Sequence, residues 1–232
     1  MEAIVLAGGL GTRLQGVIGE HPKCMANVAG QPFLAHLFEY LDRQGCTRAI
    51  LSLGFKHWEV TNWLEDQDVQ FEVDCVIESE PLGTGGGIQA ALEIADTDDV
   101  AVVNGDTMFM VNLRAQMKYH KENQAHTTLA LKEMRQFDRY GAVNTDAAGI
   151  ITSFEEKQYK DVGLINGGIY IINKEAFFQK NLPEKFSFEK DYLEKYLAER
   201  KLSGYVSVGY FIDIGIPADY ERAQTEFKTL FL

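Results

Sequence analysis

The sequence contains few cysteines, few histidines and few cations, and each shortage excludes a class of protein. Cys24, Cys46 and Cys75 fit neither a zinc motif nor a disulfide framework, so we expect three free thiols. The five histidines include no pair at metal-ligand spacing. Lysine and arginine total 22 against 34 aspartates and glutamates, which gives a net charge of −12. An acidic chain has no general attraction to nucleic acid, so any cations that bind phosphate must be few and well placed.

Long apolar runs and low-complexity segments are also missing. No stretch approaches the roughly 18 apolar residues that a membrane-spanning helix needs. Residues 1–4 lack the basic start of a signal peptide, and no linker rich in proline or serine divides the chain. We therefore expect a cytoplasmic protein without membrane or nucleic-acid partners, in which residues 1–232 form one domain.

Hydrophobic residues alternate between strand-like and helical spacing. Runs that predict strands occupy residues 3–7, 49–53, 71–77 and 100–103. Between them, helical spacing occupies residues 33–41, 58–64 and 88–95. This alternation predicts an α/β protein whose mostly parallel central sheet is covered by helices on both faces.

The pattern changes after Asp106. Strand-like segments follow one another at residues 127–131, 141–144, 150–154 and 168–172. A last helix is expected over residues 217–227, with Pro217 in its first turn. We expect this half of the chain to add antiparallel strands to the parallel sheet.

A glycine-rich loop follows the first predicted strand. Gly8, Gly9 and Gly11 allow the backbone N–H groups to approach phosphate oxygens, and Arg13 adds a cation directly after them. Arg13 stands where the P-loop needs its second glycine, and Leu14 stands where the dinucleotide-binding loop needs its third. The loop therefore predicts phosphate binding, but it matches neither of those two motifs.

The loop and five later segments carry a family resemblance. Residues 6–14, LAGGLGTRL, followed by Pro22 and Lys23, resemble the signature of the sugar-1-phosphate nucleotidyltransferases. Further resemblances follow in the family's order at residues 80–86, 103–106, 154–157, 166–170 and 211–217. Cys24 departs from the proline or alanine that usually follows the lysine. The resemblance implies a Rossmann-like, GT-A-like fold with an antiparallel extension that holds the sugar site.

The implied reaction joins a nucleoside triphosphate to a sugar 1-phosphate and releases pyrophosphate. In that family Arg13 would grip the β and γ phosphates, and Lys23 would lie between the α-phosphate and the sugar phosphate. Asp106 and Asp213 would hold Mg²⁺, for which Mn²⁺ could substitute, because magnesium prefers oxygen ligands and keeps few protein carboxylates. The attacking phosphate oxygen is already ionised at neutral pH, so the chemistry needs positioning and charge neutralisation rather than a general base.

The resemblance also assigns residues to the two substrates. Those expected to bind the nucleotide are Leu6, Ala7, Gly8, Gly9, Gly11, Thr12, Arg13, Glu78, Gly83 and Thr84. Those expected to bind the sugar phosphate are Lys23, Asn104, Gly141, Glu156, Lys157 and Asn166.

Glu78 carries the prediction of the base. Relatives that use UTP or dTTP have a glutamine at this place, and a carboxylate only accepts hydrogen bonds. Guanine offers adjacent donors at N1 and N2, so Glu78 favours GTP over UTP, CTP and ATP. The alternative is that Glu78 and Glu80 are solvated charges and that backbone groups read the base.

Within the family, the chain is most similar to the bacterial guanylyltransferases that act on D-glycero-D-manno-heptose 1-phosphate. Residues 83–86, 187–191 and 213–223 carry this likeness. Uridylyl or cytidylyl transfer to another sugar 1-phosphate, and guanylyl transfer to mannose 1-phosphate, remain alternatives. A regulatory subunit that binds nucleotide sugars without catalysis is a further one. We expect no hexapeptide-repeat domain, and either a monomer or a homodimer.

Overall fold

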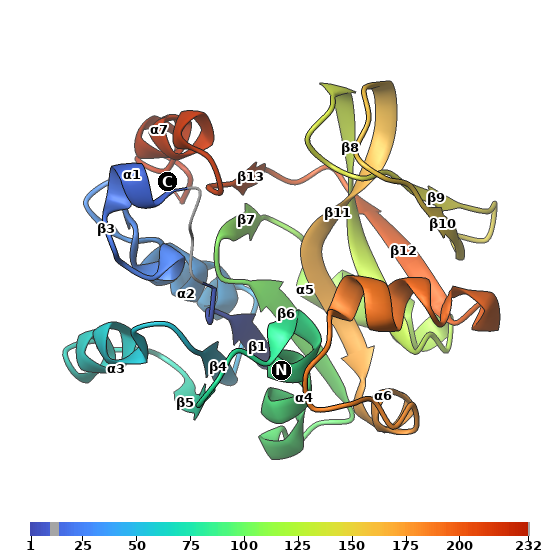
Figure 1. Cartoon of the computed structure of the whole chain (residues 1–232), viewed down its shortest axis with the longest axis horizontal. Coiled ribbons are helices and arrows are strands. Elements are labelled where there is room, and N and C mark those ends of the chain that lie inside the picture. Colours follow the sequence, from blue (N-terminus) through green and yellow to red (C-terminus); the bar gives the residue numbers. More distant parts are fainter. Residues whose placement is uncertain (10–13, 232) are drawn as a thin grey trace.

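A seven-stranded sheet in the order β12-β8-β11-β6-β1-β4-β5 runs through the molecule (Figure 1). The computed structural model describes residues 1–9 and 14–231. The strands that pair in parallel at one side are β1 (Glu2–Leu6), β4 (Arg48–Leu53), β5 (Glu72–Ile77) and β6 (Asp99–Asn104). These are the four strands that the sequence predicts before Asp106.

The other side of the sheet supplies the antiparallel extension. Strand β11 (Lys160–Asn173) runs antiparallel to β6 and to β8 (Thr127–Phe137), and β12 (Leu202–Ser207) pairs with β8 in parallel. The prediction of a mostly parallel sheet with antiparallel additions is confirmed. The sequence reading missed β12.

Among the described residues, six short strands lie outside the central sheet and pair in three ribbons. Strand β9 (Val143–Thr145) pairs with β10 (Ile151–Phe154), and β7 (Thr107–Phe109) pairs with β13 (Phe211–Asp213), both antiparallel. The strands expected near residues 141–144 and 150–154 therefore exist, but they form a ribbon of their own. A third small ribbon joins β2 (Asn27–Val28) to β3 (Gln31–Pro32).

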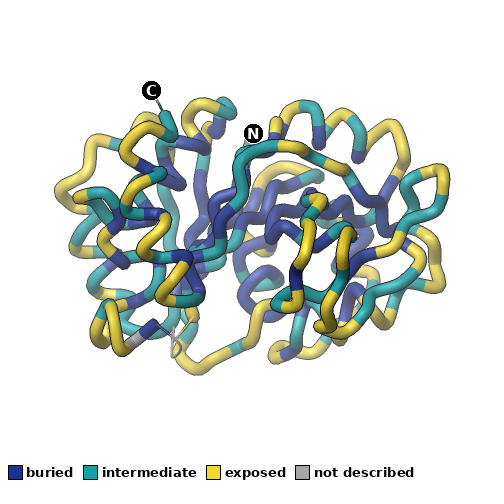
Figure 2. The backbone as a smooth tube through the Cα atoms, turned by 90° about the horizontal axis from the view of Figure 1, so that it is seen from above, coloured by how far each residue is buried: buried dark blue, intermediate teal, exposed yellow. Residues whose placement is uncertain are grey.

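Helices cover both faces of the sheet, and the alternation of side chains along each strand explains why. On β1, Ala3 and Val5 join a core with α2 (Phe33–Arg43), whereas Ile4 points to the other face and packs with α4 (Gly83–Ile94). Figure 2 shows the buried strands running through the middle of the molecule, with the exposed positions on the outer turns. The remaining α-helices are α1 (Gln15–Ile18), α3 (His57–Glu65), α5 (Leu113–Glu122), α6 (Lys174–Phe178) and α7 (Pro217–Glu226). A π-helix spans Phe188–Glu194, and two 3-10 helices span Lys23–Met25 and Leu197–Glu199.

Among the described residues, no helix combines the length and apolar character that crossing a membrane requires.

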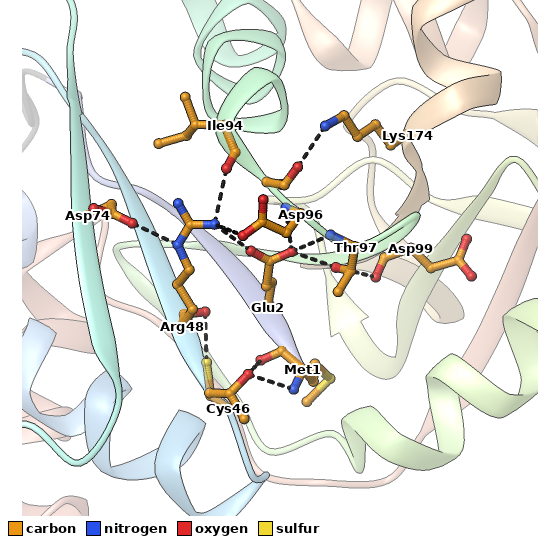
Figure 3. A network of polar contacts seen from close by, with 12 residues as sticks. Met1, Glu2, Cys46, Arg48, Asp74, Ile94, Asp96, Thr97, Asp99 and Lys174 are labelled. Carbon is orange, nitrogen blue, oxygen red and sulfur yellow. Dashed lines mark hydrogen bonds and ion pairs between the residues drawn. The ribbon is translucent and has the colours of Figure 1, made fainter.

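A polar network ties the amino ends of the central strands together (Figure 3). The guanidinium of Arg48 donates to Glu2 at 2.8 Å, to Asp74 at 2.7 Å and to Asp96 at 2.9 Å. Glu2 also accepts from the backbone N–H of Thr97 at 2.6 Å and from its hydroxyl at 2.7 Å. The network lies at the end of the strands opposite to the residues described next.

Candidate active site

A cavity of about 570 Å³ opens where four parallel strands end. Its walls come from the segments that follow β1, β4, β5 and β6, which is the edge at which open α/β sheets bind ligands. It is lined by Leu6, Ala7, Gly8, Gly9, Lys23, Cys24, Ser52, Gly54, Phe55, Glu78, Ser79, Glu80, Pro81, Gly83, Thr84, Gly87, Asn104, Gly105 and Asp106. The predicted nucleotide residues that the structure describes all lie in this lining. Gly11, Thr12 and Arg13 lie outside the described residues.

The two aspartates are brought together by the β7–β13 ribbon. Thr107 pairs with Asp213 across this ribbon, and the N–H of Ile214 donates to the carbonyl of Asp106 at 3.1 Å. The sequence predicts both aspartates at one edge of the central sheet. Asp106 does follow β6. Within the described part of the chain, however, Asp213 ends a strand that pairs with β7 and not with the central sheet, so the neighbouring ribbon carries the second carboxylate.

Lys23 contacts the first aspartate directly. Its Nζ donates to Oδ2 of Asp106 at 2.6 Å, and the lysine side chain is only 13% exposed. The hydroxyl of Thr107 donates to Oδ1 of Asp106 at 3.1 Å. Each carboxylate oxygen of Asp106 therefore has a partner, and the residue that follows the aspartate in sequence helps to orient it.

Asp213 lies in a drier and more crowded position. Burial and the negative charge of Asp106 raise the pKa of Asp213. The N–H of Gly215 and the cations Lys23 and Arg139 lower this pKa, but they do not offset the increase. The N–H of Gly215 donates to its Oδ1 at 2.7 Å. A carboxylate whose pKa is raised by the charge of a second carboxylate marks a place where added positive charge is favourable.

The donor set suits a divalent ion. Carboxylate oxygens are the ligands that hard cations such as Mg²⁺ take, usually one or two from the protein with the rest from water and substrate phosphates. Within residues 1–9 and 14–231, histidines, cysteines and acidic residues form no group of three or more that could hold a metal by itself. Asp106 and Asp213 therefore fit an ion that completes its coordination with substrate.

Glu78 lines the cavity, and two glycines lie against its carboxylate. Its Oε1 accepts from the hydroxyl of Ser52 at 3.0 Å, and its Oε2 accepts from the N–H of Leu82 at 3.0 Å. A Cβ added to Gly8 or Gly87 would come within 3.1 Å or 2.9 Å of Oε1. The carboxylate is thus fixed in orientation, and each oxygen keeps a lone pair beyond those two bonds.

The glycines at the start of α4 have a packing role beside their place in the cavity. Gly83 has a φ of +77°, and a Cβ there would lie 2.5 Å from the carbonyl oxygen of Phe186. The hydroxyl of Thr84 accepts from the N–H of Phe188 at 2.9 Å and donates to Glu189 at 2.8 Å. The hydroxyl of Thr84 therefore connects α4 to the π-helix.

On the other side of the cavity, Asn104 and Asn166 flank an irregular stretch of β11. The register of β11 against β8 shifts between Asn166 and Tyr170. Asn166 donates to the hydroxyl of Tyr170 at 2.9 Å and accepts from the N–H of Gly168 at 3.0 Å. Gly168 has a φ of +73°, and a Cβ on it would lie 2.7 Å from Nδ2 of Asn104. The structure therefore brings the two predicted asparagines to the same place.

Three other predicted sugar residues, like Asn166, are not in the cavity lining. Gly141 packs so closely that a Cβ would lie 2.5 Å from the carbonyl oxygen of Glu155. Glu156 and Lys157 are exposed in the loop between β10 and β11. Their neighbour Glu155 is held by Lys160 at 2.7 Å and Asn144 at 2.6 Å. The roles assigned to Gly141, Glu156 and Lys157 stay predictions.

Sequence reasoning missed a cluster beside Asp213. Arg139 pairs with Asp219 of α7, and its guanidinium carbon lies 5.4 Å from the centroid of the Tyr140 ring. Burial and the charge of Asp213 raise the pKa of Tyr140 to about 12. Arg139 and Tyr140 directly precede Gly141, which the family resemblance assigns to the sugar phosphate. Their position beside Gly141 was the one sequence feature that could have identified them.

The fold and the site define the class of this protein. A glycine-lined cavity at the carboxyl edge of the sheet, beside a lysine and two aspartates, is suited to bind and polarise a nucleotide's phosphates. The chain matches the Nucleotidyl transferase family over residues 2–229, and it belongs to that family.

Individual relatives narrow the class. The chain is 47% identical over 228 residues to D-glycero-alpha-D-manno-heptose 1-phosphate guanylyltransferase of Aneurinibacillus thermoaerophilus, covering 98% of this chain and 99% of the relative. It is 44% identical to the enzyme of the same name from Campylobacter jejuni, covering 95% and 97%. The crystal structure of HddC from Yersinia pseudotuberculosis superposes with a TM-score of 0.86 at 37% identity, covering 97% and 99%, and a second structure of HddC is a complex with GMP-PN.

Proposed function

We propose that the chain transfers GMP from GTP to a D-glycero-D-manno-heptose 1-phosphate and releases pyrophosphate. The observation that carries this proposal is the meeting of Lys23 with Asp106 at the wall of the glycine-lined cavity, 2.6 Å apart. Identity of 47% across nearly the whole length of a heptose 1-phosphate guanylyltransferase supports the choice of base and sugar.

The reaction is an in-line attack of the sugar phosphate on the α-phosphorus. Both reactants are anions, so their mutual repulsion is a large part of the barrier, and the site has to neutralise it. Lys23 would bind the phosphate oxygens between the two substrates. Asp106 and Asp213 would hold Mg²⁺, which would supply further positive charge to the phosphates. Arg13 would bind the β and γ phosphates.

The guanine base of the nucleotide would lie next to Glu78 and the two glycines that contact it, Gly8 and Gly87. Glu78, held by Ser52 and Leu82, presents a fixed carboxylate to the cavity. Adjacent donors of guanine match such an acceptor, whereas the edge of uracil places acceptors beside its single donor. Leu6, Ala7 and Gly83 line the same wall and would contact the base and ribose.

The sugar phosphate would lie on the side of β11. Asn104 lines the cavity, and Asn166 lies beside it across Gly168. We assign these amides to sugar hydroxyls, and we assign Gly141, Glu156 and Lys157 to the outer part of the same sugar site.

A matrix of substrates tests this function. The purified chain is incubated with GTP, UTP, CTP or ATP against heptose 1-phosphate, mannose 1-phosphate, glucose 1-phosphate and N-acetylglucosamine 1-phosphate, and pyrophosphate release is measured. The highest kcat/KM is expected for GTP with heptose 1-phosphate. A higher value for GTP with mannose 1-phosphate would overturn the sugar assignment, and a higher value for any other triphosphate would overturn the base.

A further inference from the structure

Lys23 has its ammonium group in the region where the family reaction needs a metal ion. Its Nζ lies 2.6 Å from Oδ2 of Asp106. A Cβ built on Gly215 would lie 3.3 Å from that Nζ and 2.8 Å from Oδ1 of Asp213. The ammonium therefore pairs with Asp106 and lies near Asp213, the second carboxylate that fits a divalent ion.

No other described cation forms an ion pair with these two aspartates. Lys23 is the only lysine, arginine or histidine within residues 1–9 and 14–231 that pairs with Asp106, and none pairs with Asp213. The nearby Arg139 is paired with Asp219 instead. Lys23 is also well buried, at 13% exposure, so water screens its charge only weakly.

We propose that Lys23 acts as an internal cation that occupies the metal position of the substrate-free enzyme and must leave Asp106 before a divalent ion can bind. This proposal rests on the proposed function, because that function supplies the ion and the phosphates. A magnesium–oxygen bond is about 2.0–2.1 Å long, so an ion on Oδ2 of Asp106 would take the place of the ammonium. The two cations also repel one another at such short range.

The phosphates of the nucleotide give Lys23 its alternative partner. Without them, displacing the lysine leaves a buried ammonium without an anion, which opposes metal binding. With them, the ammonium moves to a phosphate and Asp106 becomes free for the ion. The metal and the nucleotide therefore bind with positive coupling, and by linkage the coupling acts equally in both directions.

Removal of the lysine charge separates these effects. Methionine has a similar length and no charge, so Lys23→Met should free Asp106 in the substrate-free protein. We expect the affinity for Mn²⁺, measured by electron paramagnetic resonance without nucleotide, to rise at least tenfold over wild type. Lys118→Met is the matched control, because Lys118 is also paired with a carboxylate, Glu122 at 3.7 Å, but is exposed on α5 and does not line the cavity.

Two further measurements tie the gain to the named residues. Mn²⁺ should raise the thermal midpoint of Lys23→Met more than that of wild type, and Asp106→Asn in the Lys23→Met background should remove the gain in affinity. Where circular dichroism shows that Lys23→Met does not fold, Lys23→Gln replaces it in the same titration.

Equal Mn²⁺ affinity in wild type and the Lys23 variant, or an equal gain in Lys118→Met, would overturn the proposal. Because the titration contains no nucleotide or sugar, its result does not depend on which substrates the enzyme uses. A failed substrate matrix with an intact Mn²⁺ gain would reject the proposed function alone.

Discussion

Thr107 and Asp213 face each other as register partners in the β7–β13 ribbon, although they lie in opposite halves of the chain. The hydrogen bond from the N–H of Ile214 to the carbonyl of Asp106 closes the same ribbon at 3.1 Å. Backbone hydrogen bonds therefore hold the backbones of Asp106 and Asp213 next to each other.

The two aspartates should be essential to catalysis and dispensable to the fold. Asp106→Asn and Asp213→Asn should each lower kcat/KM at least ~100-fold, because each removes a charge that stabilises the ion and the transition state. Excess EDTA should abolish the activity of the wild type, and Mg²⁺ should restore it. Pyrophosphate release measures the rates, and circular dichroism checks the fold.

Asp66→Asn is the control for these substitutions, because Asp66 is exposed at the end of α3. Its activity should match the wild type. Full turnover by either site variant, or by the wild type in EDTA, would contradict the two-aspartate site.

Gly215 should be intolerant of even a methyl group. A Cβ there would meet Oδ1 of Asp213 at 2.8 Å, so the carboxylate has to shift. We expect Gly215→Ala to lower kcat about tenfold or more, since misplacement of a reacting group costs rate steeply, with little change in the thermal midpoint. Gly16→Ala is the matched control, because a Cβ on Gly16 meets nothing within 4 Å. Wild-type kcat in Gly215→Ala would show that the position of Asp213 is loosely constrained.

The sequence was informative where a single local pattern carries the signal. Apolar runs ended by glycine or polar residues located β1, β4, β5 and β6, and the residues after those runs form the cavity. Parallel strands place their carboxyl ends at one edge, so strand assignment alone gathered Gly8, Glu78 and Asp106.

The sequence does not predict contacts that depend on the pairing of segments far apart in the chain. The three-residue strands β7 and β13 are too short to show a period, so their pairing and the resulting position of Asp213 could not be read from the residues. The same holds for the ion pair of Arg139 with Asp219, which joins a loop to α7. Thr84 was assigned to the nucleotide, yet its hydroxyl bonds to Phe188 and Glu189, and no local motif indicates that partner.

Glu78 should control the choice of base. Glu78→Gln should lower the ratio of kcat/KM for GTP to that for UTP by about 10–100-fold, because an amide offers a donor where guanine also offers donors. The ratio is taken within one preparation, so a smaller folded fraction does not affect it. A smaller folded fraction is expected, because glutamine has one acceptor oxygen where Glu78 uses two. If that oxygen accepts from the hydroxyl of Ser52, the Nε2 group of the glutamine faces the N–H of Leu82, which is also a donor.

Glu80→Gln is the matched control, because Glu80 also lines the cavity but is exposed. It should keep the wild-type ratio. An unchanged ratio in Glu78→Gln would assign base selection to the backbone groups of Leu6, Ala7 and Gly83 instead.

Glu2 should make stability depend on pH without touching the site. Burial raises its pKa, but hydrogen bonds from Thr97, from the backbone of Asp96 and from Arg48 outweigh burial and hold the pKa below the ordinary value of 4.5 (Figure 3). A lowered folded-state pKa gives stability that is fully present above pH 4.5 and is lost as the pH falls through the folded value. Glu2→Gln should therefore lower the free energy of unfolding by about 3 kcal/mol at pH 7, as expected for breaking a buried, hydrogen-bonded ion pair.

The pH profile of that difference separates charge from packing. Urea unfolding of wild type and Glu2→Gln should show a constant gap between pH 5 and pH 7, which narrows below pH 4.5 because the wild type then loses the same charge. Glu65→Gln, an exposed glutamate at the end of α3, should show no gap at either pH. A gap that stays constant down to acid pH would mean that Glu2 contributes through its packing. The kcat of Glu2→Gln at pH 7 should equal that of the wild type, because the Glu2 network lies at the opposite end of the strands from Lys23 and Asp106.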